Sequence, residues 1–469
     1  MLTDNPDLAN PPVLGPEGPR AGRLQPATLL SIYVFLLMLI PSALGFNVLG
    51  GSGSPATIFA VLLFLFYLIS WLHPSLAPAR GRQPVRAGVI GFACAVIATY
   101  VSVNRVELIT VAQNGADRGV ILICGWVGVA LLAADGIDRA ADLQALLRRL
   151  VIGATTMAAL AVTQFFTGLN VAAYIKIPGL VSSTPYIDVQ NRGSLYRPSS
   201  TALDPIELAA VLVLALPIAI HQARYAPREQ RLRRWVQVGF IAAALPMTVS
   251  RTAFTALAAV ALVILPAWSR RERWYAYIVG LLGITAMALA IPGLFGTFRS
   301  LFAEVGTDTS STSRTGAFSS AAPFISQHPW LGHGFGTFLP QTYFFTDDQY
   351  LLTLIETGFV GLIALLVMFA TGWCTARAAR RLSYDPQTRH LAQCMAASVA
   401  ASAVSFATLD AFSFMIISGL TFLMIGCTGA LWRLTRTEGG TLSWDTHSPA
   451  VFRQPSRSRR PRLSPVQGR

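Results

Sequence analysis

The chain has 469 residues, of which 53% are hydrophobic and only 12% are charged, and its mean hydropathy is +0.53. Because charged residues make up about 25% of an ordinary soluble domain, this composition excludes that class and indicates a polytopic membrane protein. The net charge of +14 is spread over separate short segments, so membrane topology explains it better than a nucleic-acid-binding surface.

The chain starts with a proline-rich segment that carries charges of both signs, and residues 1–26 are therefore predicted to form a disordered cytoplasmic tail. Apolar stretches follow, each close to the roughly 20 residues that cross a bilayer. The first six predicted spans are 27–46, 55–73, 87–103, 118–135, 150–167 and 205–221.

The apolar segment from Trp235 to Trp268 is too long for one spanning helix and is interrupted only at Ser250-Arg251-Thr252. We predict two short spans that meet there. Four further spans are predicted at 274–293, 350–371, 389–409 and 412–432. The fold class is therefore all-α, with about twelve transmembrane helices within residues 27–436. Residues 437–469 form a predicted disordered basic cytoplasmic tail.

Along the chain, predicted connections rich in arginine alternate strictly with connections that contain few. The positive-inside rule then places both ends of the chain in the cytoplasm. The basic connections contain Arg80, Arg82, Arg86, Arg139, Arg148, Arg149, Arg224, Arg228, Arg231, Arg233, Arg234, Arg270, Arg271, Arg273, Arg377, Arg380, Arg381 and Arg389. The predicted location is the plasma or inner membrane.

The cysteines lie inside apolar stretches, which predicts small core residues rather than disulfides or a metal site. They are Cys94, Cys124, Cys374, Cys394 and Cys427.

Two extracytoplasmic segments, 168–204 and 294–349, are too long to be simple connections, and long loops often carry function. The second contains the stretch Phe318 to Trp330, which is predicted to be an amphipathic interfacial helix followed by a glycine-rich turn. His328 and His333 flank this turn and are secondary candidates, which we interpret as turn residues rather than catalysts.

The extracytoplasmic half contains few charged residues, and those at the ends of predicted spans should face a polar cavity or a partner. They are Arg197, Asp204, Glu207, Arg251, Arg314, Asp347, Asp348 and Glu356. The alternative is that arginines and acids neutralise one another as structural pairs. Asp410, between the last two spans, is interpreted as a solvated loop charge.

Guanidinium groups match phosphate oxygens and stay charged at any relevant pH, so several arginines near a glycine-rich turn suit a phosphate or pyrophosphate. Acidic side chains nearby could accept a proton from an attacking hydroxyl. An anion site combined with a base is what glycosyl transfer from a lipid-linked diphosphate sugar requires.

Three segments carry a family resemblance. They are Arg-Pro-Ser-Ser-Thr-Ala-Leu-Asp-Pro-Ile-Glu-Leu at 197–208, Ser-Arg-Thr at 250–252, and Ser313-Arg314 with His-Pro-Trp-Leu-Gly-His-Gly-Phe-Gly at 328–336, Asp-Asp-Gln-Tyr-Leu at 347–351 and Glu-Thr-Gly-Phe-Val-Gly at 356–361. Together they resemble the O-antigen ligase and polymerase superfamily of lipid-linked glycan transferases. Where ligase-type members have His-Asn, this chain has Asp347-Asp348.

The resemblance implies a GT-C-like membrane enzyme in which Arg197, Arg251 and Arg314 bind the diphosphate of an undecaprenyl-diphosphate glycan. It implies Asp347 or Asp348 as the base, with Glu356 as a further catalytic candidate, and Asp204 and Glu207 as additional candidates. The expected reaction is inverting and needs no metal or cofactor. Expected partners are membrane lipids, a flippase and a chain-length regulator, and no nucleic acid.

Polymerisation of a surface polysaccharide or exopolysaccharide is favoured over ligation to a lipid or protein acceptor, because the His of the ligases is absent. A twelve-helix secondary transporter is the alternative from another class, but its usual long central cytoplasmic loop and paired broken spans are not seen here. A non-catalytic partner in polysaccharide assembly is the third reading.

Overall fold

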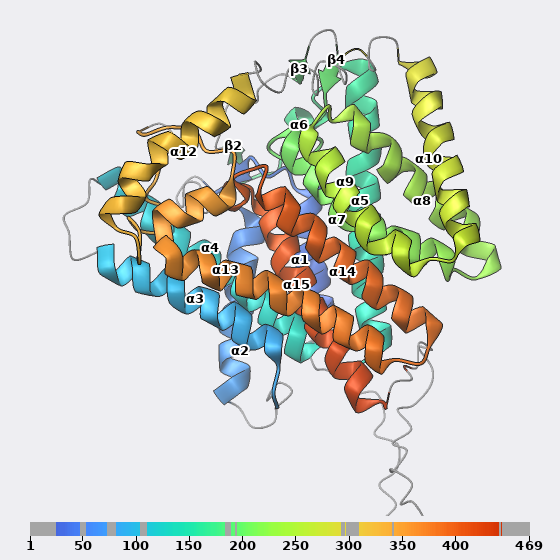
Figure 1. Cartoon of the computed structure of the whole chain (residues 1–469), viewed down its shortest axis with the longest axis horizontal. Coiled ribbons are helices and arrows are strands. Elements are labelled where there is room, and N and C mark those ends of the chain that lie inside the picture. The colour runs from blue at the N-terminus through green and yellow to red at the C-terminus, as the bar shows by residue number, and fades with distance from the viewer. Residues whose placement is uncertain are drawn as a thin grey trace, which may run out of the picture.

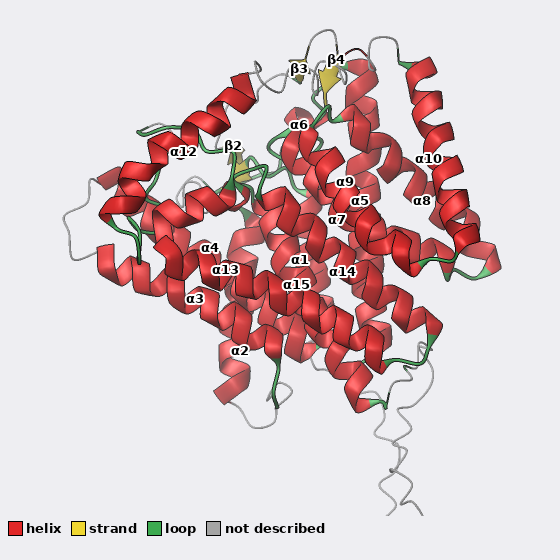
Figure 2. Cartoon of the chain, in the orientation of Figure 1, coloured by secondary structure: helices red, strands yellow, loops and turns green. Residues whose placement is uncertain are grey.

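The computed structural model describes residues 25–46, 53–72, 81–103, 110–182, 189–192, 195–291, 296, 309–339, 342–439 and 442. Helices dominate these residues, and the strands form two short antiparallel pairs (Figures 1 and 2). The predicted all-α class is therefore confirmed. Nearly all of the two predicted tails lies outside the described residues.

Each predicted span overlaps one helix of the described residues. These helices are α1 (Pro26–Leu39), α2 (Pro55–Leu72), α3 (Pro84–Val103), α4 (Thr110–Gly136), α5 (Ala140–Thr167), α7 (Pro205–Arg224), α8 (Arg228–Met247), α9 (Arg251–Ile264), α10 (Arg270–Ala290), α13 (Gln349–Leu382), α14 (Pro386–Phe406) and α15 (Met415–Thr437).

Eight of these helices are long and apolar enough to cross a membrane: α2, α3, α4, α5, α7, α10, α13 and α15. Helices α1 and α9 are apolar but shorter, whereas α8 and α14 are long enough but do not reach the same apolarity. The chain is a multi-pass membrane protein, and the total of twelve spans stays a prediction.

Helices α7 and α15 lie at the centre of the bundle. In each of them, 89% of the residues in the apolar 18-residue stretch are buried. Helices α4 and α15 approach so closely that a Cβ added at Gly426 would lie 2.4 Å from the carbonyl oxygen of Ala130. By contrast, α10 stands at the edge of the bundle (Figure 1). None of its residues is buried, as suits a helix in contact with lipid. Cys94 and Cys374 are also exposed, so the prediction that all cysteines lie in the core is wrong for these two.

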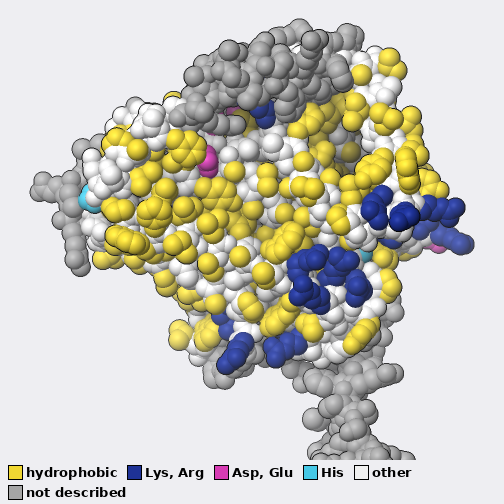
Figure 3. Space-filling model, in the orientation of Figure 1, with side chains coloured by type: hydrophobic (Ala, Val, Ile, Leu, Met, Phe, Trp, Pro, Cys, Tyr) yellow, Lys and Arg dark blue, Asp and Glu magenta, His cyan; other side chains and the backbone are white. Residues whose placement is uncertain are grey.

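One end of the bundle carries most of the arginines, which Figure 3 shows gathered at the lower centre and right edge around an apolar surface. There the basic connections contact one another. The Arg224 guanidinium forms an ion pair with Glu272 across two connections, and the Tyr225 hydroxyl donates to the carbonyl oxygen of Pro386 at 3.2 Å. The predicted basic connections therefore share one end, and its cytoplasmic orientation stays a prediction.

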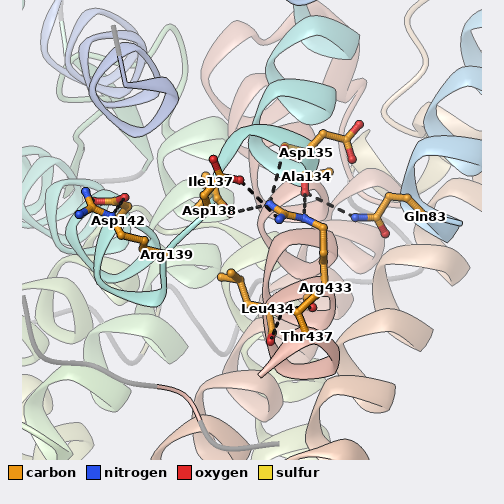
Figure 4. Close-up of polar contacts among 10 residues, drawn as sticks. All are labelled: Gln83, Ala134, Asp135, Ile137, Asp138, Arg139, Asp142, Arg433, Leu434 and Thr437. Carbon is orange, nitrogen blue, oxygen red and sulfur yellow. Dashed lines mark hydrogen bonds and ion pairs between the residues drawn. The ribbon is translucent and has the colours of Figure 1, made fainter. Parts of the chain in front are cut away.

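Arg433 of α15 fastens this end to the link between α4 and α5 (Figure 4). Its Nε donates to the carbonyl oxygen of Ala134 at 3.3 Å and its Nη2 to that of Ile137 at 2.5 Å, while Nη1 lies 3.6 Å from Asp138 Oδ1. The last carbonyls of a helix have no partner inside the helix, so Arg433 supplies donors to the end of α4.

The opposite end contains helix α12 (Thr309–Gln327) and the short elements: β1 (Leu44–Gly45) paired with β2 (Val181–Ser182), α6 (Val171–Tyr174), β3 (Gln190–Arg192) paired with β4 (Leu195–Arg197), and η3 (Ala411–Ser413). A further short turn, η2 (Leu265–Ala267), follows α9.

A helix is present at the place predicted for the interfacial helix, but with other bounds, and its position at the membrane surface stays a prediction. Helix α12 begins before Phe318 and ends at Gln327, and a turn follows through Trp330 to the glycines. Ala317 and Ala321 of α12 are buried against Leu351 and Ile355 of α13. The helix therefore packs on the bundle rather than lying on it loosely.

Candidate functional site

Helix α13 is interrupted near its start by Gly358, whose backbone angles are φ 62° and ψ −166°. Glycine tolerates this left-handed region, which other residues rarely adopt. The glycine-rich turn at 328–336 fills the break. The N–H groups of Phe359 and Val360 donate to the carbonyl oxygens of Pro329 at 2.8 Å and Trp330 at 3.2 Å.

The same turn also satisfies carbonyls on the other side of the break. The N–H of His333 donates to the carbonyl oxygen of Ile355 at 3.0 Å, and that of Gly334 to Glu356 at 2.8 Å. An added Cβ at Gly332 would lie 2.3 Å from the carbonyl carbon of Glu356. The predicted glycine turn therefore exists, and its glycines permit a close backbone approach; no phosphate contact is needed to explain them.

Glu356 is buried at this break, with 4% of its surface exposed. Its carboxyl group accepts hydrogen bonds from the backbone N–H groups of Gly336 and Phe338, the latter at 3.4 Å. These contacts tie the turn to α13. The structure thus gives Glu356 a positioning contact.

Glu207 is fully buried and is bound in the same way to another helix end. Its Oε1 accepts from the N–H of Ile416 at 2.8 Å, at the start of α15, and its Oε2 accepts from Leu203 at 2.9 Å. A carboxylate at a helix N-terminus satisfies donors that the helix leaves open. Glu207 therefore holds the first turn of α15 against α7.

Arg197 ends strand β4, directly opposite Gln190 of β3 in the antiparallel register. Its Nε donates to the carbonyl oxygen of Thr248 at 3.2 Å, and its Nη1 donates to Gln190 Oε1 at 3.3 Å. Thr248 belongs to the short connection from α8 to α9, and Arg251 is the first residue of α9. Two of the three predicted arginines are thus brought to one place.

Two residues around this place have unusual backbone conformations. Val249, in the α8–α9 connection, has φ 47°, and Ser200 has φ 57°. A β-branched residue with positive φ is strained and must be held by its surroundings. The Ser200 N–H donates to Gln164 Oε1 at 2.7 Å, and the Thr201 hydroxyl donates to the carbonyl of Met38 at 2.6 Å, which fixes the segment that follows Arg197.

Asp204 connects the arginines to the acidic residues. Its Oδ1 accepts from the N–H of Ile206 at 2.8 Å, so it caps α7, while its Oδ2 accepts from Gln190 Nε2 at 2.9 Å. Gln190 therefore lies between Arg197 and Asp204 in a hydrogen-bonded chain. Burial lowers the pKa of the Arg197 guanidinium, and the negative charge of Asp204 opposes this change.

Asp410 is only partly exposed, so its interpretation as a solvated loop charge is wrong. Burial is the main cause that raises the pKa of Asp410 to about 6, and the carboxylates of Asp347 and Asp204 act in the same direction. Asp410 therefore joins the candidate site.

Gln349 joins the segments that carry Asp347 and Asp410. Its side chain is fully buried at the start of α13, and its Oε1 accepts from the N–H of Phe412 at 2.8 Å. Phe412 in η3 also packs on Phe335 of the turn, with ring centroids 5.5 Å apart. Asp348 caps α13 by accepting from Tyr350 N–H at 2.8 Å.

The two histidines contact each other and the end of α12. Their ring centroids lie 4.8 Å apart, and His333 Nε2 lies 3.0 Å from the carbonyl oxygen of Phe324. Burial lowers the pKa of His333, which favours the neutral ring. Arg314 lies in α12, but its side chain falls outside the part that the structure describes.

The site therefore combines arginines at the β4 and α8–α9 segments with carboxyl groups from the α7, α13 and α14–α15 segments. Among the described residues, no group of three His, Cys, Asp or Glu side chains is arranged to hold a metal ion. The arrangement suits an anionic ligand with an acceptor of protons close by.

Residues 237–366 match the family model described as O-antigen ligase. This segment contains Arg251, the glycine-rich turn and the break in α13. A comparison with curated proteins found no match.

Proposed function

We infer the function of this chain from the match of residues 237–366 to the O-antigen ligase family model, and we propose that it polymerises polyprenyl-diphosphate-linked oligosaccharides at the extracytoplasmic face. The observation that carries the proposal is the hydrogen bond from Arg197 to the α8–α9 connection that ends at Arg251, together with the charge interaction between Arg197 and Asp204. Asp204 in turn interacts with Asp410, as Asp347 does.

In the proposed reaction, Arg197, Arg251 and Arg314 bind the diphosphate of the donor. Guanidinium groups compensate the charge that develops on the diphosphate as the bond to the anomeric carbon breaks. Arg197 supports this role because its described hydrogen-bond acceptors, Thr248 and Gln190, are neutral and leave its charge for a ligand.

The acceptor hydroxyl attacks the anomeric carbon from the side opposite the leaving diphosphate, which inverts the configuration at that carbon. The hydroxyl proton goes to a carboxylate, for which we propose Asp347. Asp348 is less suitable because its Oδ1 caps α13, and Glu356 because backbone N–H groups occupy its carboxyl. The chemistry of the proposed residues supplies both the anion site and the base, so no metal ion is included.

We favour polymerisation over ligation to a lipid or protein because Asp347-Asp348 replaces the His-Asn of ligase-type members. Membrane lipids surround the protein, and a flippase and a chain-length regulator are the proposed pathway partners. The arginine-rich end faces the cytoplasm in this proposal, in the plasma or inner membrane.

The direct test supplies the purified chain in detergent or nanodiscs with a polyprenyl-diphosphate oligosaccharide. We expect longer lipid-linked glycan, with one polyprenyl diphosphate released for each transfer. Addition of a candidate lipid or protein acceptor then separates the two alternatives, since a ligase gives product only when that acceptor is present. If neither reaction occurs with a folded protein, the proposed function is wrong.

A further inference from the structure

A pocket at the arginine-rich end of the bundle lies far along the helices from the site described above. It opens between α5, the end of α7 and the start of α8. Polar side chains line it, among them Gln144 and Arg148 of α5, Gln222 of α7, and Gln230 and Arg234 of α8. Three helices thus contribute groups that can donate hydrogen bonds.

Gln222 is the buried polar group of this pocket, with 7% of its surface exposed. Within the described part of the chain, neither its Nε2 nor its Oε1 has a hydrogen-bond partner. A buried amide without partners costs roughly 1–3 kcal/mol, so such groups usually serve a ligand or ordered water. Gln222 is also one of the residues that line the pocket.

The two arginines of the pocket are close enough for their charges to repel each other, and Arg233 adds to the repulsion at Arg234. Arg234 donates to the neutral Gln237 Oε1 at 3.1 Å. No carboxylate within the described ranges forms an ion pair with Arg148 or Arg234, whereas Arg224 nearby is paired with Glu272. An anion between Arg148 and Arg234 would remove this repulsion.

We propose that this pocket is a binding site for a phosphate group, held by Arg148 and Arg234 and by the amide of Gln222. Guanidinium groups fit phosphate oxygens, and a tetrahedral anion can receive donors from three helices at once. The site is separate from the proposed transfer reaction. Its occupant would fix the spacing of α5, α7 and α8 at this end.

The phosphate can belong to the headgroup of an anionic phospholipid or to a free phosphate compound. Beside the pocket, α8 exposes Leu232, Trp235 and Val236, with 77%, 47% and 48% of their surfaces accessible. This apolar face next to a basic pocket is the setting in which lipid headgroups bind between membrane helices, and tryptophan is common at that depth.

The test uses the full chain in detergent with two probes. Native mass spectrometry measures retention of phosphatidylglycerol against diacylglycerol with the same acyl chains, and thermal unfolding measures the shift caused by inorganic phosphate. We expect Arg148→Gln and Arg234→Gln each to weaken about tenfold the binding of whichever of the two probes binds to the wild type. This is the effect of losing one charge-assisted hydrogen bond. Arg231→Gln, an exposed arginine of the same helix outside the pocket lining, is the matched control.

Retention of phosphatidylglycerol that depends on Arg148 and Arg234 identifies a lipid headgroup, and a phosphate shift with the same dependence identifies a free compound. Gln222→Glu provides a variant that should remain folded, because its carboxylate would pair with the arginines. We expect it to melt higher than wild type without ligand and to lose the response to the probe. The proposal is wrong if neither probe separates the two pocket variants from Arg231→Gln, or if Gln222→Glu responds as wild type does.

Discussion

Three arginines at one end of the helix bundle and Arg197 at the other end are held in different ways. At the arginine-rich end, Arg86 is paired with Asp135 at 2.9 Å, Arg139 with Asp142 at 2.9 Å, and Arg433 with Asp138 at 3.6 Å. At the other end, Arg197 is held by a backbone carbonyl and a glutamine amide. In the first arrangement a carboxylate of the protein neutralises the guanidinium charge. In the second, the acceptors are neutral and the charge can bind an anionic ligand.

This difference gives a physical criterion for choosing among many arginines. A guanidinium paired with a carboxylate acts mainly in packing and in fastening helix ends. One that is positioned by neutral acceptors keeps its orientation and its charge for an anionic ligand. Arg234 satisfies the same criterion at the arginine-rich end through its hydrogen bond to Gln237. Arg377 and Arg380, which donate to Gln393, are further arginines there with a neutral acceptor.

The strongest test of this comparison exchanges the two kinds of arginine for alanine. We expect Arg251→Ala and Arg197→Ala to lower the rate of glycan transfer about 10²–10³-fold, as loss of a charge-stabilising donor does, with a small change in melting temperature. Arg433→Ala should lower the melting temperature clearly and change the transfer rate little, because it leaves helix-end carbonyls and Asp138 without their donor. Released polyprenyl diphosphate per folded molecule measures the rate. Equal rate losses in all three variants would remove the distinction between the two ends.

Asp347→Asn tests the acidic half of the site. We expect a rate loss of about 10²-fold, since a positioned base contributes at least that much, while Asp348→Asn should keep most of the rate and stability, because asparagine also caps helix N-termini. The measurement is transfer rate at saturating donor together with the melting temperature. A larger rate loss in Asp348→Asn would make that residue the base.

Gly358→Ala tests whether the break in α13 supports the site. The added Cβ would lie 2.3 Å from the carbonyl carbon of Trp330 in a backbone conformation that alanine avoids, so we expect a loss of about 3 kcal/mol or more. Gly283→Ala in α10 is the control, because no atom lies within 4 Å of its added Cβ. The control should be neutral or slightly stabilising. Similar melting temperatures for both variants would contradict the packed turn.

The smallest expected effect concerns Asp410. Its pKa of about 6 in the folded protein exceeds the ordinary value of 3.8, so ionisation in the folded state costs stability above about pH 6. That cost disappears as the pH falls from 6 toward 3.8. We expect Asp410→Asn to raise the melting temperature by a few degrees at pH 7.5 and by almost nothing near pH 4. A constant difference across this range would show that burial of the charge is not the cause.

The helices could be predicted from sequence because apolar runs and basic connections report directly on the bilayer. The tight connection at Ser250-Arg251 was also visible in this way. The roles of individual acidic residues could not be predicted, because they depend on contacts between distant segments. Glu207 caps a helix two hundred residues further along, and Glu356 binds the turn before it. The approach of Asp204 and Asp347 to Asp410 has no local signal at all.

The insertion of the turn into α13 also bears on how the protein enters the membrane. Without residues 333 and 334, the carbonyl oxygens of Ile355 and Glu356 would lose their described donors, and an unsatisfied backbone group in hydrocarbon costs several kcal/mol. The first turns of α13 therefore become compatible with the bilayer only when the preceding turn is already in place. We therefore expect helix α12, the turn and α13 to insert as one unit, so that Gly358→Ala lowers the inserted fraction of the protein as well as its melting temperature.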